Sequence, residues 1–386
     1  MTTLTRRTGL IAASLLAATA LGTAAFAQTA EINIGISLST TGPAAALGIP
    51  EKNSIDFVPK EIGGVKLNLI VLDDAGDPTA ATTNARRMVS ENKVDILVGS
   101  SITPTGIAMG NVATETGVPH FSLAPMPMPP EKAKWTVVMP QPVPLMAKVI
   151  FAHMKASGAK TVGMIGFSDS WGDLWAKEFA ANGAPLGLSM VADERYARAD
   201  TSVTGQALKL VAAKPDVILV AASGTGAALP QIALRERGFA GKIYQTHGAV
   251  SKDFIRIAGK SAEGVLMASG PVVAAEGLAD ASPVKKPAVA YVTAYEAKYG
   301  KDSRTQFGAH MFDTFEVLKR VVPVALKTAK PGTPEFKEAI RAALISEKEI
   351  AASQGVYNFT ATDRYGVDDR ARVLITVKDG AFAVVP

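Results

Sequence analysis

Short apolar runs alternate with longer amphipathic stretches along most of the chain. An apolar run between turn-forming segments predicts a buried strand, and apolar residues three and four apart predict a helix. The predicted strands are residues 31–38, 65–72, 94–98, 118–123, 137–139, 161–166, 188–194, 217–222, 242–246 and 264–268. The predicted helices are residues 79–91, 145–156, 174–182, 203–213, 227–237, 288–299, 309–328 and 334–345. This alternation predicts an α/β protein with parallel sheets and right-handed crossovers.

Turn-forming residues divide this pattern into parts. Proline is dense at residues 140–144, where we expect the chain to leave one lobe and begin another. Residues 125–130 predict a stiff proline-rich loop, and residues 274–286 predict a mobile loop. The last two apolar runs, residues 373–377 and 381–385, flank an Asp-Gly pair and predict a β-hairpin.

One strand ends in a group of hydroxyl residues. The strand at residues 94–98 is followed by a glycine and then by a predicted helix at residues 106–113. Hydroxyl groups and free backbone N–H groups at the start of a helix suit a carboxylate or a phosphate. We therefore expect an anion site here. The hydroxyl residues are Ser100, Ser101, Thr103 and Thr105.

The first 27 residues predict a signal peptide. Arg6 and Arg7 precede an apolar stretch at residues 10–21, which is short for a membrane span. The segment from Ala25 to Ala27 fits the small-x-small cleavage rule. We expect cleavage near Ala27 and a periplasmic product, with a membrane anchor as the competing interpretation.

Composition excludes several classes of function. The chain has no cysteine, which excludes disulfides, zinc–thiolate sites and thiol nucleophiles. Without the signal peptide, 38 basic residues face 35 acidic ones, and no basic run with interleaved aromatic residues occurs, so we expect no nucleic-acid partner. A chain of 386 residues is long for one core, so two lobes are expected.

Several segments, in order, resemble the solute-binding proteins of ABC transporters in the branched-chain amino acid group. These are type I periplasmic binding proteins. The segments are IGISLSTTGPAAALG, VLDDAGDPTAATTNARRMV, DILVGSSITPTGIA, GVPHFSLAP, KTVGMIGFSDSWGD, ADERYARADTSVTGQALKL, PDVILVAASG and RTQFGAHMFDTFEVL.

The resemblance implies two Rossmann-like lobes joined by a hinge of three strands. Lobe one would comprise residues 28–143 plus 271–355, and lobe two residues 144–270 plus 364–386. The lobes would close on a small-molecule ligand, and a membrane permease would be the partner. It implies a monomeric carrier with no cofactor, no metal and no catalytic residue.

The resemblance also implies ligand contacts in lobe one. Thr103 falls at the main carboxylate-binding hydroxyl, with Ser101 and Thr105 beside it; ordinary helix capping is the alternative. Ala124 would offer its backbone. Met126 replaces a hydroxyl residue of the family and makes this wall more apolar.

In lobe two, Trp171 falls where family members stack an aromatic ring on the ligand, with a packing anchor as the alternative. Gly224 and Thr225 match a second contact loop. Leu47, from lobe one, lies where relatives carry a larger group that closes the pocket.

The departure at His247 is the most informative. Amino acid binders of the family carry an acidic residue there, which pairs with the ligand's α-ammonium group, and a histidine does this poorly. His247 is predicted to be either a ligand contact or a satisfied structural histidine. We predict a carboxylate without an ammonium group, with an aromatic acid as the leading ligand; a branched-chain amino acid carrier is the alternative.

An enzyme and a ligand sensor are the other classes that the sequence could indicate. Ser-Gly-Thr-Gly at residues 223–226 resembles the start of a dinucleotide fingerprint, but Leu229 replaces the third glycine. No GxSxG segment occurs, and the four histidines lack the spacing of metal ligands. An enzyme is therefore not expected. A ligand-sensing protein of the same fold is the remaining alternative.

Overall fold

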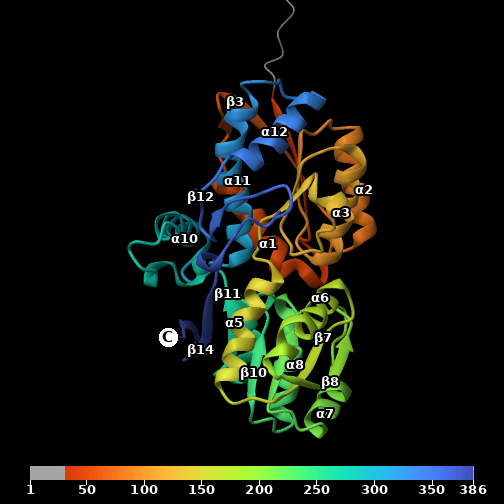
Figure 1. The fold of residues 1–386 in the computed structure, drawn as a ribbon, viewed down its shortest axis with the longest axis vertical. Coiled ribbons are helices and arrows are strands. Elements are labelled where there is room, and N and C mark those ends of the chain that lie inside the picture. The colour runs from red at the N-terminus through yellow and green to blue at the C-terminus, as the bar shows by residue number, and fades with distance from the viewer. Residues whose placement is uncertain (1–30, 386) are drawn as a thin grey trace, which may run out of the picture.

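A computed structural model describes residues 31–385, which form two lobes stacked along the long axis of the molecule (Figure 1). Each lobe contains a central sheet with helices on its faces. The predicted α/β class with mostly parallel sheets is therefore confirmed. The predicted signal peptide lies outside the described residues.

The first sheet has six strands in the order β2-β3-β1-β4-β5-β6. All neighbours pair in parallel except β2 and β3, which are antiparallel. The strands are β1 (Ile32–Leu38), β2 (Glu61–Ile62), β3 (Val65–Asp73), β4 (Ile96–Gly99), β5 (His120–Ser122) and β6 (Thr136–Val138).

Two clusters of buried side chains cover the faces of this sheet. One joins β1, β4 and β5 to the long helix α11 (Gln306–Ala325) and to α12 (Pro334–Ser346). The other joins α2 (Pro78–Ser90) to α3 (Thr103–Thr116). Helix α10 (Lys285–Tyr299) projects from the side of the lobe in Figure 1.

The second sheet has seven strands in the order β15-β14-β11-β10-β9-β7-β8. The strands from β11 to β8 are parallel, and the terminal hairpin of β14 and β15 adds antiparallel to β11. The strands are β7 (Thr161–Phe167), β8 (Ser189–Tyr196), β9 (Val217–Ala221), β10 (Lys242–Gln245), β11 (Leu266–Ser269), β14 (Val373–Lys378) and β15 (Ala381–Val384).

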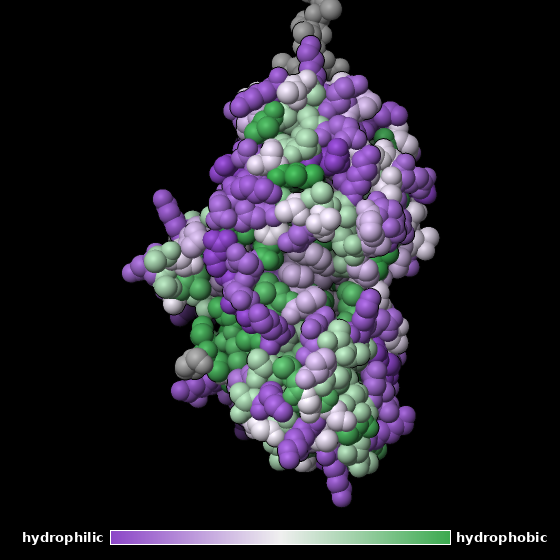
Figure 2. Space-filling model, viewed as in Figure 1, coloured by the Kyte–Doolittle hydropathy of each residue, from purple (hydrophilic) through white to green (hydrophobic). Residues whose placement is uncertain are grey.

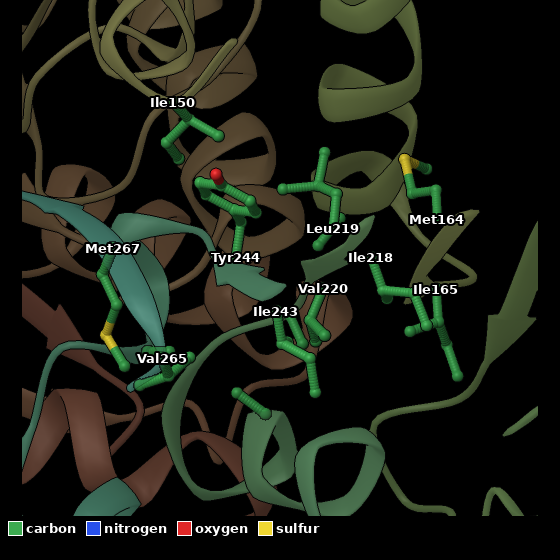
Figure 3. Packing of buried hydrophobic residues seen from close by; sticks show 14 of the residues in the cluster. Ile150, Met164, Ile165, Ile218, Leu219, Val220, Ile243, Tyr244, Val265 and Met267 are labelled. Atoms are coloured by element: carbon green, nitrogen blue, oxygen red, sulfur yellow. The ribbon is translucent and has the colours of Figure 1, made fainter. Parts of the chain in front are cut away.

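Apolar side chains from strands and helices meet in the core of the second lobe. Ile150 lies close to Tyr244 and Leu219, and residues of β7 and β11 surround them (Figure 3). The helices are α5 (Val143–Ala156), α6 (Ser170–Glu178), α7 (Thr204–Ala212), α8 (Ala228–Glu236) and α9 (Lys252–Ala258). Polar side chains cover much of both lobes, apart from an apolar area near the C-terminal strands (Figure 2).

The chain passes between the sheets three times: after β6, after β11, and between β13 (Val356–Tyr357) and β14. The third crossing lies later than predicted. Arg364 Nε donates to Thr136 O, and the Tyr365 hydroxyl donates to Met126 O, so both residues lie against the first lobe. Beginning lobe two at residue 364 was therefore wrong; the other lobe boundaries stay predictions.

Further differences from the predicted elements are local. Helix α3 begins at Thr103 because Pro104 fits the first turn of a helix, so the start predicted at residue 106 was late. The short hairpin of β12 (Ile350–Ala351) and β13 was missed, since two-residue strands carry no periodicity. Part of the loop predicted at 274–286 forms 3₁₀ turns at Pro271–Gly277. Within residues 31–385, no helix is long and apolar enough to cross a membrane.

Candidate functional site

A cavity lies between the lobes; about 360 Å³ there is free of protein atoms, and part of this space is open to solvent. Both lobes contribute to its walls, and Pro140 comes from the first passage between them. The lining residues are Leu47, Ser101, Ile102, Thr103, Leu123, Ala124, Pro125, Pro140, Trp171, Arg198, Ser223, His247, Gly248, Phe307 and His310.

The hydroxyl groups of the first lobe are engaged within the protein. Ser101 Oγ donates to Glu51 at 2.5 Å, and Thr103 Oγ1 donates to Pro125 O at 2.7 Å. Thr105 Oγ1 donates to Ile102 O at 2.9 Å, an arrangement that caps the start of α3, and Thr105 does not line the cavity. Ser101 and Thr103 lie at the site, but their O–H groups already have acceptors.

Buried carboxyl groups support this wall from behind. Asp74 accepts hydrogen bonds from Ser37, Ser39 and Ser100 at 2.6–2.8 Å. Glu51 is fully buried, and burial raises its pKa well above the ordinary value. These contacts fix the loop after β4, and neither carboxyl group lines the cavity.

The next loop contributes only in part. Ala124, predicted to offer its backbone to a ligand, lines the cavity. Met126 does not: its side chain packs against Gly106 and Gly110 of α3, and its backbone N–H and C=O both bond the Tyr365 hydroxyl. The apolar wall predicted from Met126 is thus formed instead by neighbouring apolar residues such as Leu123 and Pro125.

Trp171 presents its ring to the cavity. It lies in the first turn of α6, where its backbone N–H donates to Asp169 Oδ1, and its Nε1–H donates to Ala222 O at 3.1 Å. The indole is 3% exposed and lies edge-on to the His247 ring, with centroids 5.2 Å apart. Because its polar atom is satisfied, Trp171 can offer a ligand only an aromatic surface.

The lobes touch beside the cavity. Gly224 has φ +58°, and a Cβ placed on it would lie 2.8 Å from Leu47 Cδ1. Leu47 lines the cavity, whereas Gly224 and Thr225 do not. Gly224 therefore allows α1 (Ala45–Ser54) of the first lobe to approach the second closely.

Arg198 is a lining residue that the sequence analysis missed. Its Nε lies 2.6 Å from Asp169 Oδ2, its Nη1 donates to Ser223 Oγ at 2.9 Å, and its guanidinium lies 4.1 Å from the Phe167 ring centroid. Burial lowers its pKa from 12.5. These contacts use two of the five guanidinium N–H groups.

Two histidines form another part of the wall. His247 and His310 are each 2% exposed, and burial lowers the pKa of each to about 3, so both are neutral near pH 7. Gln306 Nε2 donates to His247 O and so links α11 to the second lobe. His310 and its neighbour Phe307 were both missed, although they lie in the segment RTQFGAHMFDTFEVL.

The lining carries one formal positive charge, on Arg198, and no aspartate or glutamate. Within residues 31–385, no three His, Asp or Glu side chains gather in a way that could hold a metal ion. The arrangement is a largely apolar cavity between two lobes, with a single charged side chain in its lining.

Comparison with known proteins agrees with this class. The family model for periplasmic binding proteins matches residues 31–380, so the chain belongs to the periplasmic binding protein family. The solved structure of Rp1789 from Rhodopseudomonas palustris (strain CGA009) is 67% identical, with a TM-score of 0.91 over 92% of this chain and 100% of that chain. The Leu/Ile/Val-binding protein BraC3 of Rhizobium johnstonii is 25% identical over 90% of this chain and 93% of its own length.

A more distant structure shares the fold alone. It is an R. palustris ABC-transporter solute-binding protein, RPA0668, solved in complex with benzoate. It is 17% identical, with a TM-score of 0.79 over 92% of this chain and 95% of that chain. The predicted resemblance to the branched-chain amino acid group of type I periplasmic binding proteins is confirmed by the family match and the curated relative.

Proposed function

We propose that this protein is the periplasmic solute-binding component of an ABC uptake transporter and carries a small aromatic monocarboxylate. The ligand binds in the cavity between the lobes, and lobe closure presents it to a membrane permease. The observation that carries the proposal is the charge of the cavity wall: one arginine and no carboxylate.

The charge pattern disfavours an amino acid. An α-ammonium group buried in a cavity needs an anionic partner, because a buried unpaired charge is costly. Asp169 is already paired with Arg198, and Glu51 lies behind Ser101 with a raised pKa. A carboxylate alone would instead find the guanidinium of Arg198.

The remaining wall suits a flat apolar body. Trp171 and Phe307 supply aromatic surface, and Leu47, Ile102 and Leu123 supply aliphatic surface. Pairs of aromatic rings gain stability beyond the area that they bury. An aromatic ring fills such a space with little loss of conformational entropy, since it is rigid.

The relatives support a binding protein and leave the ligand to be tested. The name of BraC3 points to leucine, isoleucine and valine, whereas the structure of RPA0668 contains benzoate. Members of this fold thus accept both kinds of carboxylate. A branched-chain amino acid is therefore the competing ligand.

A thermal-shift screen separates the two ligands. A compound that binds the folded protein raises its melting temperature by mass action. We expect stabilisation by benzoate- or cinnamate-type acids and none by leucine, isoleucine or valine at equal concentration. Stabilisation by the three amino acids alone would refute the aromatic ligand.

A further inference from the structure

The histidine wall of the cavity has polar atoms without partners. Within residues 31–385, no hydrogen-bond partner faces Nδ1 or Nε2 of His247, or Nδ1 of His310. Leaving a buried donor or acceptor unpaired is costly, and most such atoms in folded proteins are satisfied. Three unpaired ring nitrogens on one cavity therefore indicate a polar ligand group at this place.

The protonation of His310 follows from its other contact. His310 Nε2 lies 3.1 Å from Gln354 Nε2, and the same amide nitrogen donates to Gln306 O at 3.1 Å. The bond to Gln306 orients the amide, and an amide nitrogen can only donate. His310 Nε2 is therefore the acceptor, so the single proton of the neutral ring lies on Nδ1, the nitrogen without a partner.

Gln354 is itself held firmly. Its backbone N–H donates to Asp313 Oδ2 at 2.8 Å, and Asp313 also accepts from Ser353 and Tyr357. Gln354 lies in the turn between β12 and β13, where the Gln141 side chain donates to its carbonyl oxygen. Gln354 is thus a positioning residue that fixes the tautomer of His310.

The two rings together offer both kinds of hydrogen-bonding group. His310 offers the Nδ1–H donor, and His247, with both nitrogens free, offers one donor and one acceptor. An ionised carboxylate only accepts and an ammonium group only donates. A hydroxyl group does both.

We propose that His247 and His310 form a hydroxyl-reading subsite, which binds a phenolic hydroxyl on the ring of the aromatic acid. The hydroxyl oxygen accepts from His310 Nδ1–H, and its proton is donated to the bare nitrogen of His247. This inference rests on the proposed function and narrows its ligand to hydroxylated aromatic acids.

Calorimetric titration with cinnamate and 4-hydroxycinnamate tests this subsite. We expect 4-hydroxycinnamate to bind the unaltered protein at least about tenfold more tightly, because a site built to bind a hydroxyl rejects the analogue without it. In His310→Phe this ratio should fall to about one to two, because the donor that binds the hydroxyl is gone. His153→Phe is the control, since His153 bonds Tyr244 and does not line the cavity.

Each outcome has a distinct meaning. Equal binding of the two acids by the unaltered protein overturns the subsite and leaves the proposed function standing. If His310→Phe keeps the tenfold preference for 4-hydroxycinnamate over cinnamate, the subsite is also overturned. Binding of neither acid, with binding of leucine, refutes the proposed function itself.

The role of Gln354 has its own readout. Imidazole ¹⁵N chemical shifts distinguish the Nδ1–H from the Nε2–H tautomer. We expect His310 to be the Nδ1–H form in the unaltered protein and to gain the Nε2–H form in Gln354→Met. The ratio of 4-hydroxycinnamate affinity to cinnamate affinity should also be smaller in Gln354→Met. An Nε2–H signal for His310 in the unaltered protein contradicts the assignment.

Discussion

The two polar walls of the cavity differ in what they leave free. On the wall of α3, the hydroxyl protons of Ser101 and Thr103 already bind protein acceptors. Elsewhere in the lining, His247 and His310 have ring nitrogens without partners, and Arg198 keeps further N–H groups. The hydrogen-bond donors of Ser101 and Thr103 are thus satisfied within the protein. The histidines and Arg198 have hydrogen-bonding groups that only a ligand or solvent can satisfy. Residue type alone does not reveal this difference, because the difference depends on which acceptor each polar hydrogen binds in the folded protein.

The largest expected effect comes from Arg198. Arg198→Met removes the one cation of the lining, and we expect aromatic-acid affinity to fall about 100-fold, since a buried charged hydrogen bond is worth a few kcal/mol. Isothermal titration calorimetry measures the change. Arg195→Met is the matched control, because Arg195 pairs with Asp193 outside the cavity. A loss of affinity below about threefold in Arg198→Met would show that the ligand carboxylate binds elsewhere, at Ser101 and Thr103.

Closure of the clamp should depend on Gly224. An alanine Cβ there would overlap Leu47 and strain a backbone at φ +58°, so Gly224→Ala should hold the lobes apart and weaken binding about tenfold. Small-angle scattering with ligand should show a larger radius of gyration than that of the unaltered protein. Gly205→Ala, which adds its methyl group to open space, is the control. Full affinity and an unchanged radius would show that this contact does not limit closure.

Thr103 should matter less for binding than the sequence analysis predicts. Its hydroxyl donates to Pro125 O, so Thr103→Val should cost about 1 kcal/mol of unfolding free energy but less than about threefold in affinity. Chemical denaturation and calorimetry measure the two effects separately. A large loss of affinity with little loss of stability would show that this hydroxyl turns to the ligand.

The histidines also give a pH signature. Their pKa values are about 3 in the folded protein against 6.5 ordinarily, so between pH 3 and 6.5 only the unfolded chain binds these protons. Each histidine therefore lowers stability as the pH falls below 6.5, by about 1.4 kcal/mol per pH unit. Asp313, whose pKa burial raises to about 7, acts in the opposite direction, as does Glu51.

A difference measurement isolates one histidine from these opposing groups. From pH 6.5 to 5.5, the unfolding free energy of the unaltered protein should fall by about 1 kcal/mol relative to His310→Phe. Denaturant titrations at several pH values measure this difference. Parallel pH profiles of the two proteins would show that His310 titrates normally. They would contradict its role as a neutral Nδ1–H donor.

The sequence predicted the fold well because strands and helices alternate with clear turn residues between them. Of the residues predicted to contact a ligand, six line the cavity: Leu47, Ser101, Thr103, Ala124, Trp171 and His247. Arg198 was missed because it closely follows β8. Exposed and partly buried side chains alternate along this strand, so an arginine just beyond it is expected to face solvent. His310 lies within a helix more than sixty residues from His247, and no local pattern joins the two. Thr105 and Met126 lie close in the sequence to residues that line the cavity, but neither lines it. The Thr105 side chain caps α3, and the Met126 side chain packs against α3.

One pair of ligands tests the central claim most directly. 3-Phenylpropanoate and phenylalanine share ring and carboxylate and differ by the α-ammonium group alone. If the cavity lacks an anionic partner for that group, calorimetry should show 3-phenylpropanoate binding at least about 100-fold more tightly, because burying an unpaired ammonium is costly. Equal or tighter binding of phenylalanine would contradict the account and assign the cavity to amino acids.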